Sequence, residues 1–179
     1  MAKLLDKVLV VDIEATCWEK IPRGSTNEII EISLTVLNTK TNKNEANEGI
    51  IVKPTTTTVS EFCTQLTTLT QADVDKGITF AQACGVLTNN YQSTKYTFAS
   101  WGDYDRNQFK RQCEKELVPY PFSTTHLNVK NLFAIKYKLD KEVGMMEALQ
   151  LSKLEHTGVH HRGFSDSLNI TNLLLHLLN

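Results

Sequence analysis

Four apolar residues, Val8 to Val11, run directly into two acids, Asp12 and Glu14. A short run of valine and leucine is typical of a strand that is buried on both faces of a sheet. In a strand, residues two apart point to the same side, so both carboxylates are predicted to share one face at the end of this strand. Like charges repel, and burying a carboxylate is costly. The stretch therefore predicts a sheet protein that has a chemical reason to hold two acids together.

The other elements follow from the hydrophobic pattern and from the turn residues between them. We expect strands at 8–15, 28–37, 49–53, 95–101 and 126–129, and helices at 80–91, from 103 or 105 to 116, at 131–138, 145–151 and 165–178. Apolar residues recur through the Thr-rich segment 55–76, which we therefore expect to be a folded connection with a short helix. The pattern predicts an α/β fold, with a five-stranded mixed sheet (three antiparallel strands first) flanked by helices.

The composition is that of an ordinary globular protein, and we expect a single domain over residues 1–179. The net charge of −1 gives no overall basic signature, which weakens the case for binding long nucleic acid but leaves room for a local groove. The four cysteines are scattered without a C-x-x-C pair, which argues against a zinc site or a disulfide framework. No apolar run is long enough for a membrane span, and the N-terminus does not resemble a signal peptide. We expect a cytoplasmic protein with reduced thiols and no membrane association.

Two further acids occupy positions where they would meet the first pair. Asp105 follows the fourth predicted strand, where either it or Asp103 would also suit the N-cap of the next helix. Asp166 begins a stripe on the last predicted helix whose members at i+4, i+7 and i+11 are all apolar. Ser165 or Asp166 would also suit an N-cap. An acid that continues a buried stripe nevertheless requires a positive partner.

Metal ions are the partner that this set of acids predicts. In α/β sheets, ligands bind at the carboxyl ends of the strands. Converging carboxylates at that place would repel strongly unless cations lay between them. A ligand set made only of oxygens favours Mg²⁺ or Mn²⁺ over zinc. Two such ions, about 3.5–4 Å apart, are suited to in-line displacement at phosphorus.

Three stretches, D-I-E-A-T, Y-D-R-N-Q-F and H-R-G-F-S-D, resemble the motifs of a known family. They are similar to the three exonuclease motifs of the DEDDh group of 3′→5′ exonucleases, in the DnaQ-like branch of the ribonuclease-H-like fold. Connecting stretches such as N-E-I-I-E-I-S resemble most the Eri-type and histone-mRNA 3′-exonuclease subgroup and its bacterial KapD-like relatives. The resemblance extends over about Val8 to Leu178. It implies removal of nucleoside 5′-monophosphates from single-stranded 3′ ends, with RNA preferred because this subgroup mostly acts on RNA.

The resemblance also assigns site residues by position. It makes four acids the ligands of two Mg²⁺ or Mn²⁺ ions and one histidine the general base: Asp12, Glu14, Asp105 and Asp166, and His161. Beside the 3′ end it places Ala15, Thr16 and Tyr104. Asp105 matches rather than Asp103 because it follows an aromatic residue and precedes x-x-x-F. His161 matches rather than His160 because it lies five residues before Asp166, and an ordinary histidine can accept a proton near neutral pH.

The chain departs from its relatives in two places. Many of them have two acids where this chain has Ser165 and Asp166. Animal relatives carry a nucleic-acid-binding segment before the nuclease domain, whereas seven residues precede the first predicted strand here. We therefore expect that targeting function to be absent or to be supplied elsewhere, as by a protein partner.

Other functions remain open beside the leading one. Within the same reaction class, the alternative is DNA trimming or proofreading. In a different class, the chain would be a non-catalytic regulatory binding protein on the same fold, against which the intact set of five residues argues. A lone loop histidine usually faces solvent, so the role of His161 depends on its neighbours. The chain has no Gly-rich turn between a predicted strand and a predicted helix, which argues against a dinucleotide cofactor.

Overall fold

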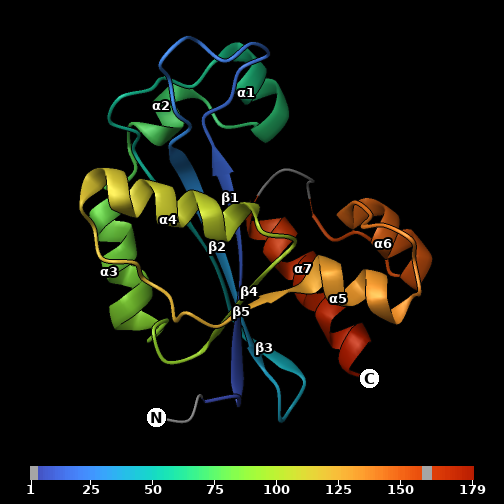
Figure 1. Ribbon diagram of the computed structural model, residues 1–179. Helices are drawn as coiled ribbons and strands as arrows, with labels where there is room; N and C mark the ends of the chain where they lie inside the picture. Colours follow the sequence, from blue (N-terminus) through green and yellow to red (C-terminus); the bar gives the residue numbers. More distant parts are fainter. Residues whose placement is uncertain (1–3, 159–162) are drawn as a thin grey trace.

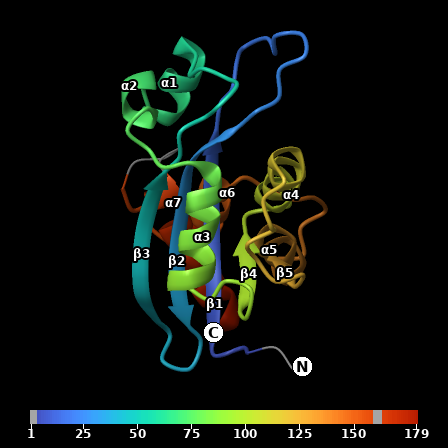
Figure 2. The same cartoon turned by 90° about the vertical axis from the view of Figure 1, so that its left-hand side faces the viewer.

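The structure is a computed structural model that describes residues 4–158 and 163–179. Its sheet has five strands in the order β3-β2-β1-β4-β5, which Figure 2 shows side by side with β1 in the middle; Figure 1 shows the same sheet nearly edge-on. The strands are β1 Lys7–Ala15, β2 Ile29–Asn38, β3 Lys43–Ile51, β4 Thr97–Ser100 and β5 His126–Asn128. The first three pair antiparallel, and β4 and β5 continue the sheet parallel to β1. This is the mixed sheet of the ribonuclease-H-like α/β fold, as predicted.

Helices cover both faces of this sheet. They are α1 Glu61–Thr67, α2 Gln71–Val74, α3 Phe80–Asn90, α4 Tyr104–Glu116, α5 Val129–Lys136, α6 Met145–Ser152 and α7 Gly163–Leu178. Figures 1 and 2 show α3 and α4 on one side and α5, α6 and α7 on the other, with α1 and α2 near the end of β1. Within the described residues, no helix is long and apolar enough to cross a bilayer.

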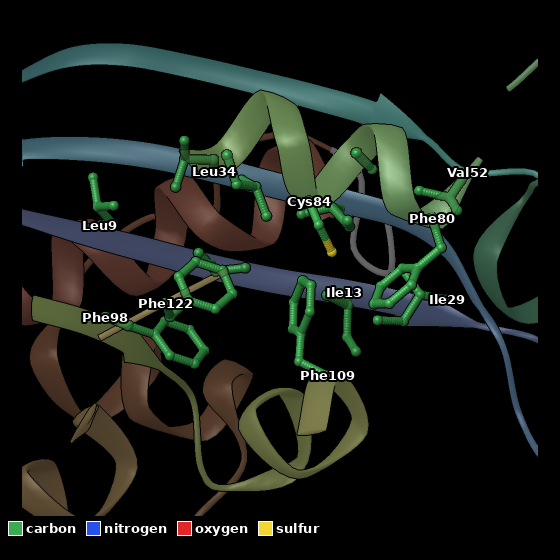
Figure 3. Close-up of a cluster of buried hydrophobic side chains, with 14 of the residues drawn as sticks. Leu9, Ile13, Ile29, Leu34, Val52, Phe80, Cys84, Phe98, Phe109 and Phe122 are labelled. Atoms are coloured by element: carbon green, nitrogen blue, oxygen red, sulfur yellow. The ribbon is translucent and has the colours of Figure 1, made fainter. Parts of the chain in front are cut away.

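Aromatic rings fill the core between the sheet and the pair α3 and α4 (Figure 3). The ring of Phe122 stacks on Phe98 with the centroids 4.3 Å apart, and it meets the ring of Phe109 edge-on at 4.9 Å. Phe98 comes from β4 and Phe109 from α4. The rings therefore fix α4, the helix that begins beside Asp105, against the sheet.

The two faces of β1 belong to different cores, and this decides where its acids lie. Leu9, Val11 and Ile13 pack in the core under α3 and α4. Val8 and Val10 pack in the second core, under α5, α6 and α7. Because alternate residues of a strand point to opposite faces, Asp12 and Glu14 continue the second row. They therefore emerge on the side of the sheet that α7 covers.

Several predicted boundaries differ from the structure, and two of these differences have identifiable reasons. The third strand begins at Lys43 and not at Gly49. It is an edge strand with mostly polar, exposed side chains, so the pairing with β2 defines it and the hydrophobic pattern does not. The fifth helix begins at Val129 and not at Asn131, because the side chain of Asn128 accepts a hydrogen bond from the backbone of Asn131 and caps the helix there.

Candidate metal centre

Asp12, Glu14 and Asp166 bring carboxylate oxygens to within 4.8 Å of one another. The first two lie at the end of β1, where the register with β2 shifts between Glu14 and Ala15. Asp166 lies in the first turn of α7, which packs against β1 and β2. A central strand and the helix that covers it thus supply the three acids from distant parts of the chain, as the sequence predicts.

Asp166 is 4% exposed and continues the buried side of α7. The apolar members of its predicted stripe are all buried, namely Ile170, Leu173 and Leu177. The helix begins at Gly163, so neither Ser165 nor Asp166 is its N-cap and that alternative is wrong. The carboxylate of Asp166 therefore belongs to the interior of the site and not to a helix end.

Asp105 is likewise 4% exposed and turns toward β1. Its Oδ1 accepts a hydrogen bond of 3.1 Å from the backbone N–H of Ile13, the residue between the two acids of β1. The N-cap position of α4 belongs to Asp103, whose side chain makes no capping bond and pairs with Arg106 at 2.9 Å. The capping alternative for Asp105 is therefore wrong, and its carboxylate faces the same site as the other three.

These side chains line one cavity of ≈ 340 Å³. Its lining residues are Asp12, Ile13, Glu14, Trp101, Tyr104, Asp105, Met145, Asp166 and Ile170. Acids form one part of the wall, and apolar side chains form the rest. Tyr104 is 54% exposed, so much of its ring is open to solvent beside the carboxylates. The cavity therefore offers a charged region together with aromatic and apolar surface.

Two carboxylates of this site, those of Asp12 and Asp105, lie where their charged form is disfavoured. Burial, followed by the charges of neighbouring acids with Asp105 first, raises the pKa of Asp12 well above its usual range. Burial raises the pKa of Asp105 to about 7, against the lowering effect of its backbone hydrogen bonds and of a bond from Ser100. Glu31, which is 2% exposed and pairs with Glu14 across the two strands, adds a further acid near Asp12.

A divalent cation fits this arrangement. It would oppose the effect of burial on both pKa values and relieve the repulsion at Asp12, because its charge favours the ionised form of each acid. The donors are all carboxylate oxygens, which suit Mg²⁺ or Mn²⁺. The clustered residues Asp12, Glu14 and Asp166 could hold one ion, and Asp105 lines the same cavity.

The residues predicted to lie beside a 3′ end differ in their surroundings. Thr16 is fully buried, and its hydroxyl accepts a hydrogen bond of 2.9 Å from the backbone of Glu28. Thr57 donates its one hydroxyl hydrogen to Glu28, so at the 3.0 Å contact between the two threonines it is Thr16 that donates. Ala15 is nearly buried, whereas Tyr104 is exposed in the cavity. A contact of Thr16 or Ala15 with a substrate stays a prediction.

His161 and its neighbour His160 lie outside the described residues, so the assignment of His161 as the general base stays a prediction.

Another histidine near the site, His156, belongs to no motif and was not predicted. The Nε2 atom of His156 lies 3.9 Å from Oδ1 of Asp166. The apolar wall made by Trp101 and Met145 was also missed. Neither feature belongs to a sequence motif, because the fold brings these residues together from separate segments.

Comparison with known proteins agrees with this geometry. Residues 9–174 match the model of the RNase_T exonuclease family. The chain is 30% identical over 184 residues to 3′-5′ exoribonuclease 1 of Homo sapiens, a match that covers 97% of this chain and 52% of that protein. It is 30% identical over 193 residues to ERI1 exoribonuclease 2 of Mus musculus, covering 94% of this chain and 28% of that protein. The chain thus spans about half of the first relative and less of the second.

Solved structures share both the fold and part of the sequence. The nuclease domain of 3′hExo, a DEDDh family member bound to rAMP, superposes with a TM-score of 0.84 at 29% identity, over 96% of this chain and 90% of that one. A 3′-exonuclease in a structure of histone mRNA stem-loop recognition superposes with a TM-score of 0.88 at 28% identity, over 98% of this chain and 64% of that one. The chain therefore belongs to the RNase_T exonuclease family, as a DEDDh member similar to the exoribonuclease 1 and 3′hExo group.

Proposed function

We propose that this protein is a metal-dependent 3′-5′ exonuclease that removes nucleoside 5′-monophosphates from single-stranded nucleic acid, with RNA preferred. The observation that carries the proposal is the convergence of Asp12, Glu14 and Asp166 within 4.8 Å. Without cations these acids would repel a phosphodiester, and with divalent cations they become a site for one. The exposed ring of Tyr104 in the same cavity offers a surface for a base.

The residues of the site then have three roles, which are metal binding, stacking on a base and proton transfer. Asp12, Glu14 and Asp166 would hold one divalent ion, and Asp105 together with Asp12 a second, either Mg²⁺ or Mn²⁺. When bound, these ions supply positive charge to the phosphate and acidify the attacking water. The ring of Tyr104 stacks on the terminal base, which is recognition that tolerates any sequence. His161 accepts the proton of the attacking water, as an imidazole can near neutral pH.

RNA is the preferred substrate class because the similar relatives are named exoribonucleases. A contact to the 2′-hydroxyl is what separates RNA from DNA at such a site, and removal of DNA ends is the alternative within the same chemistry. The chain covers 52% of the human relative, so we also propose that a protein partner or further segment supplies substrate targeting.

The experiment compares 5′-labelled RNA and DNA oligonucleotides of one sequence, incubated with Mg²⁺, Mn²⁺ or EDTA. We expect products that shorten stepwise from the 3′ end in either metal, faster for RNA, and no products in EDTA. Asp166→Asn should abolish shortening, and Glu19→Gln, which alters an exposed acid beyond the first strand, should keep it. Internal cuts or activity in EDTA would contradict the proposal. No shortening of either oligonucleotide would favour the regulatory binding protein.

The role of His161 has its own test with a neighbouring control. We expect His161→Asn to lower the rate by about 100-fold or more, because positioned proton transfer contributes about 10²–10⁴-fold. It should also flatten the pH dependence of the rate between about pH 6 and 8. His160→Asn should keep both. A wild-type rate and pH profile in His161→Asn would remove this histidine from the mechanism.

A further inference from the structure

A buried histidine is connected to Asp105 through a serine. Ser100 is the last residue of β4, and His126 is the first residue of the parallel strand β5. The Nε2 atom of His126 lies 2.8 Å from the hydroxyl oxygen of Ser100. Ser100 is fully buried and the side chain of His126 is 2% exposed. The same hydroxyl contacts the carboxylate of Asp105 and lies 2.9 Å from the carbonyl oxygen of Gly102.

The chemistry of the neighbours fixes the direction of these hydrogen bonds. A carbonyl oxygen can only accept, so Ser100 donates its one hydrogen toward Gly102 at 2.9 Å, and the neighbouring carboxylate of Asp105 shares that hydrogen as a second acceptor. Ser100 must then accept from His126, which places a proton on Nε2. Burial, with the charge of Arg106 second, lowers the pKa of His126 to about 4, so the ring is neutral near pH 7. The neutral ring therefore donates to Ser100, and Ser100 donates toward the acid.

The far side of the histidine is enclosed by its neighbours, although its Nδ1 carries no hydrogen in this tautomer and makes no hydrogen bond there. Its Nδ1 atom lies 3.7 Å from Oδ1 of Asp103, which pairs with Arg106 at 2.9 Å. Its ring packs on Phe98 with the centroids 4.8 Å apart. A purely structural role would need no more than the satisfaction of buried polar groups. This connection, however, ends on a carboxylate that lines the acidic cavity.

Asp105 is thus held from two directions. The backbone of Ile13 binds its Oδ1 from the side of β1, and the hydroxyl of Ser100 binds it from the side of β4 and β5. Two such contacts restrict the rotation of the carboxyl group. A carboxylate has about four lone-pair positions, so both contacts leave some of them for a cation. Hydrogen bonds of this kind orient metal ligands, and their loss typically weakens metal binding about 10–100-fold.

We propose that Ser100 and His126 are positioning residues that hold the carboxylate of Asp105 in the orientation a divalent cation requires. The inference rests on the proposed function, because it treats Asp105 as a ligand, and it adds two residues that belong to none of the three motifs. Loss of either hydrogen bond should weaken metal binding through Asp105 while the fold remains.

The test uses paired variants of the full chain. Ser100→Ala removes the hydroxyl, and Ser100→Thr keeps it. His126→Phe keeps a ring against Phe98 but removes the donor, and His126→Gln restores an N–H at a similar reach. Ser123→Ala is the matched control, since Ser123 is also buried near β5 and donates to the carbonyl of Thr125 at 3.2 Å.

Mn²⁺ binding by calorimetry is the first readout, and the Mg²⁺ dependence of the exonuclease rate is the second. We expect Ser100→Ala and His126→Phe to weaken at least one Mn²⁺ site by about 10-fold or more. The Mg²⁺ concentration for half-maximal rate should rise more than the rate at saturating Mg²⁺ falls. The double variant should bind Mn²⁺ no more weakly than the weaker single one, because both residues act through the same bond. Ser100→Thr and His126→Gln should bind Mn²⁺ nearly as wild type does.

Normal Mn²⁺ binding by Ser100→Ala would overturn the inference, and so would an equal loss in Ser123→Ala. If His126→Phe does not fold, the Ser100 pair and His126→Gln still decide the outcome. The two proposals fail in different ways. A wild-type protein that binds Mn²⁺ but cuts no nucleic acid contradicts the proposed function alone, whereas active wild-type protein with unaltered variants contradicts only the role of Ser100 and His126.

Discussion

Replacing Glu28 by glutamine would remove a buried charge that three consecutive threonines hold. Glu28 is 1% exposed, and its oxygens accept hydrogen bonds of 2.6–3.2 Å from three backbone N–H groups and two hydroxyls. The donors are Thr55, Thr56 and Thr57. Burial alone would raise the pKa of Glu28, but these bonds, with those from Thr57 and Thr55 first, outweigh burial and lower it from 4.5 to about 2.

This pKa sets both the size and the sign of the effect. A change from 4.5 to about 2, at about 1.4 kcal/mol per pKa unit, corresponds to about 3 kcal/mol of unfolding free energy. Because the native carboxyl holds its charge more firmly than the unfolded one, this contribution is complete above about pH 5. It is lost as the pH falls from about 4.5 toward 2. Glu28→Gln should therefore cost about 3 kcal/mol at pH 7 and progressively less in acid.

Urea unfolding followed by circular dichroism at pH 7, 5 and 3 measures this difference. The control is Glu114→Gln, an exposed acid of the same type on α4, which should unfold like wild type at each pH. A constant difference between wild type and Glu28→Gln from pH 7 to 3 would refute the reasoning. A difference below about 1 kcal/mol at pH 7 would refute it as well, since the hydrogen bonds would then not favour the charged form.

Three other substitutions test the site and the core. Asp12→Asn should raise the melting temperature of the metal-free protein, because it removes a charge disfavoured by burial and by neighbouring acids. The same variant should lower the exonuclease rate at least about 100-fold. A lower melting temperature would contradict this reasoning. Tyr104→Ala should raise KM for a single strand about 5- to 150-fold, the value of about 1–3 kcal/mol of stacking, while Tyr104→Phe keeps it. An unchanged KM in the alanine variant would exclude stacking. Phe109→Ala should lower the unfolding free energy measured in urea by about 3–5 kcal/mol, since the ring is fully buried; a loss below about 1 kcal/mol would mean that the core refills the space.

The parts of the fold that follow a periodic pattern of apolar residues were predictable. The alternation of β1 placed Asp12 and Glu14 on one side, and the helical spacing after Asp166 placed that acid on the buried side of α7. In both cases a periodic pattern within one element decides the direction of the side chain. The edge strand β3 has no such pattern, because most of its side chains are polar and exposed. Its length is determined by its pairing with β2.

The parts of the site that depend on contacts between elements were not predictable. Nothing in the sequence around Trp101 or Met145 indicates that they line the cavity with the acids. The contact of Ser100 with His126 exists because β4 and β5 pair in parallel at one register. Single residues carry no periodicity, so only the folded arrangement relates them to Asp105.

The clustered acids come from opposite ends of the chain, and this affects when the site can exist. Asp12 and Glu14 belong to β1, which the ribosome makes before the other strands and helices described here, and Asp166 belongs to α7, which it makes after them. A nascent chain can pair β1 with β2 through a short connection, but it carries only two of the three clustered acids until α7 emerges and packs on them. The complete set of clustered acids therefore exists only after α7 has been made and has packed on the sheet.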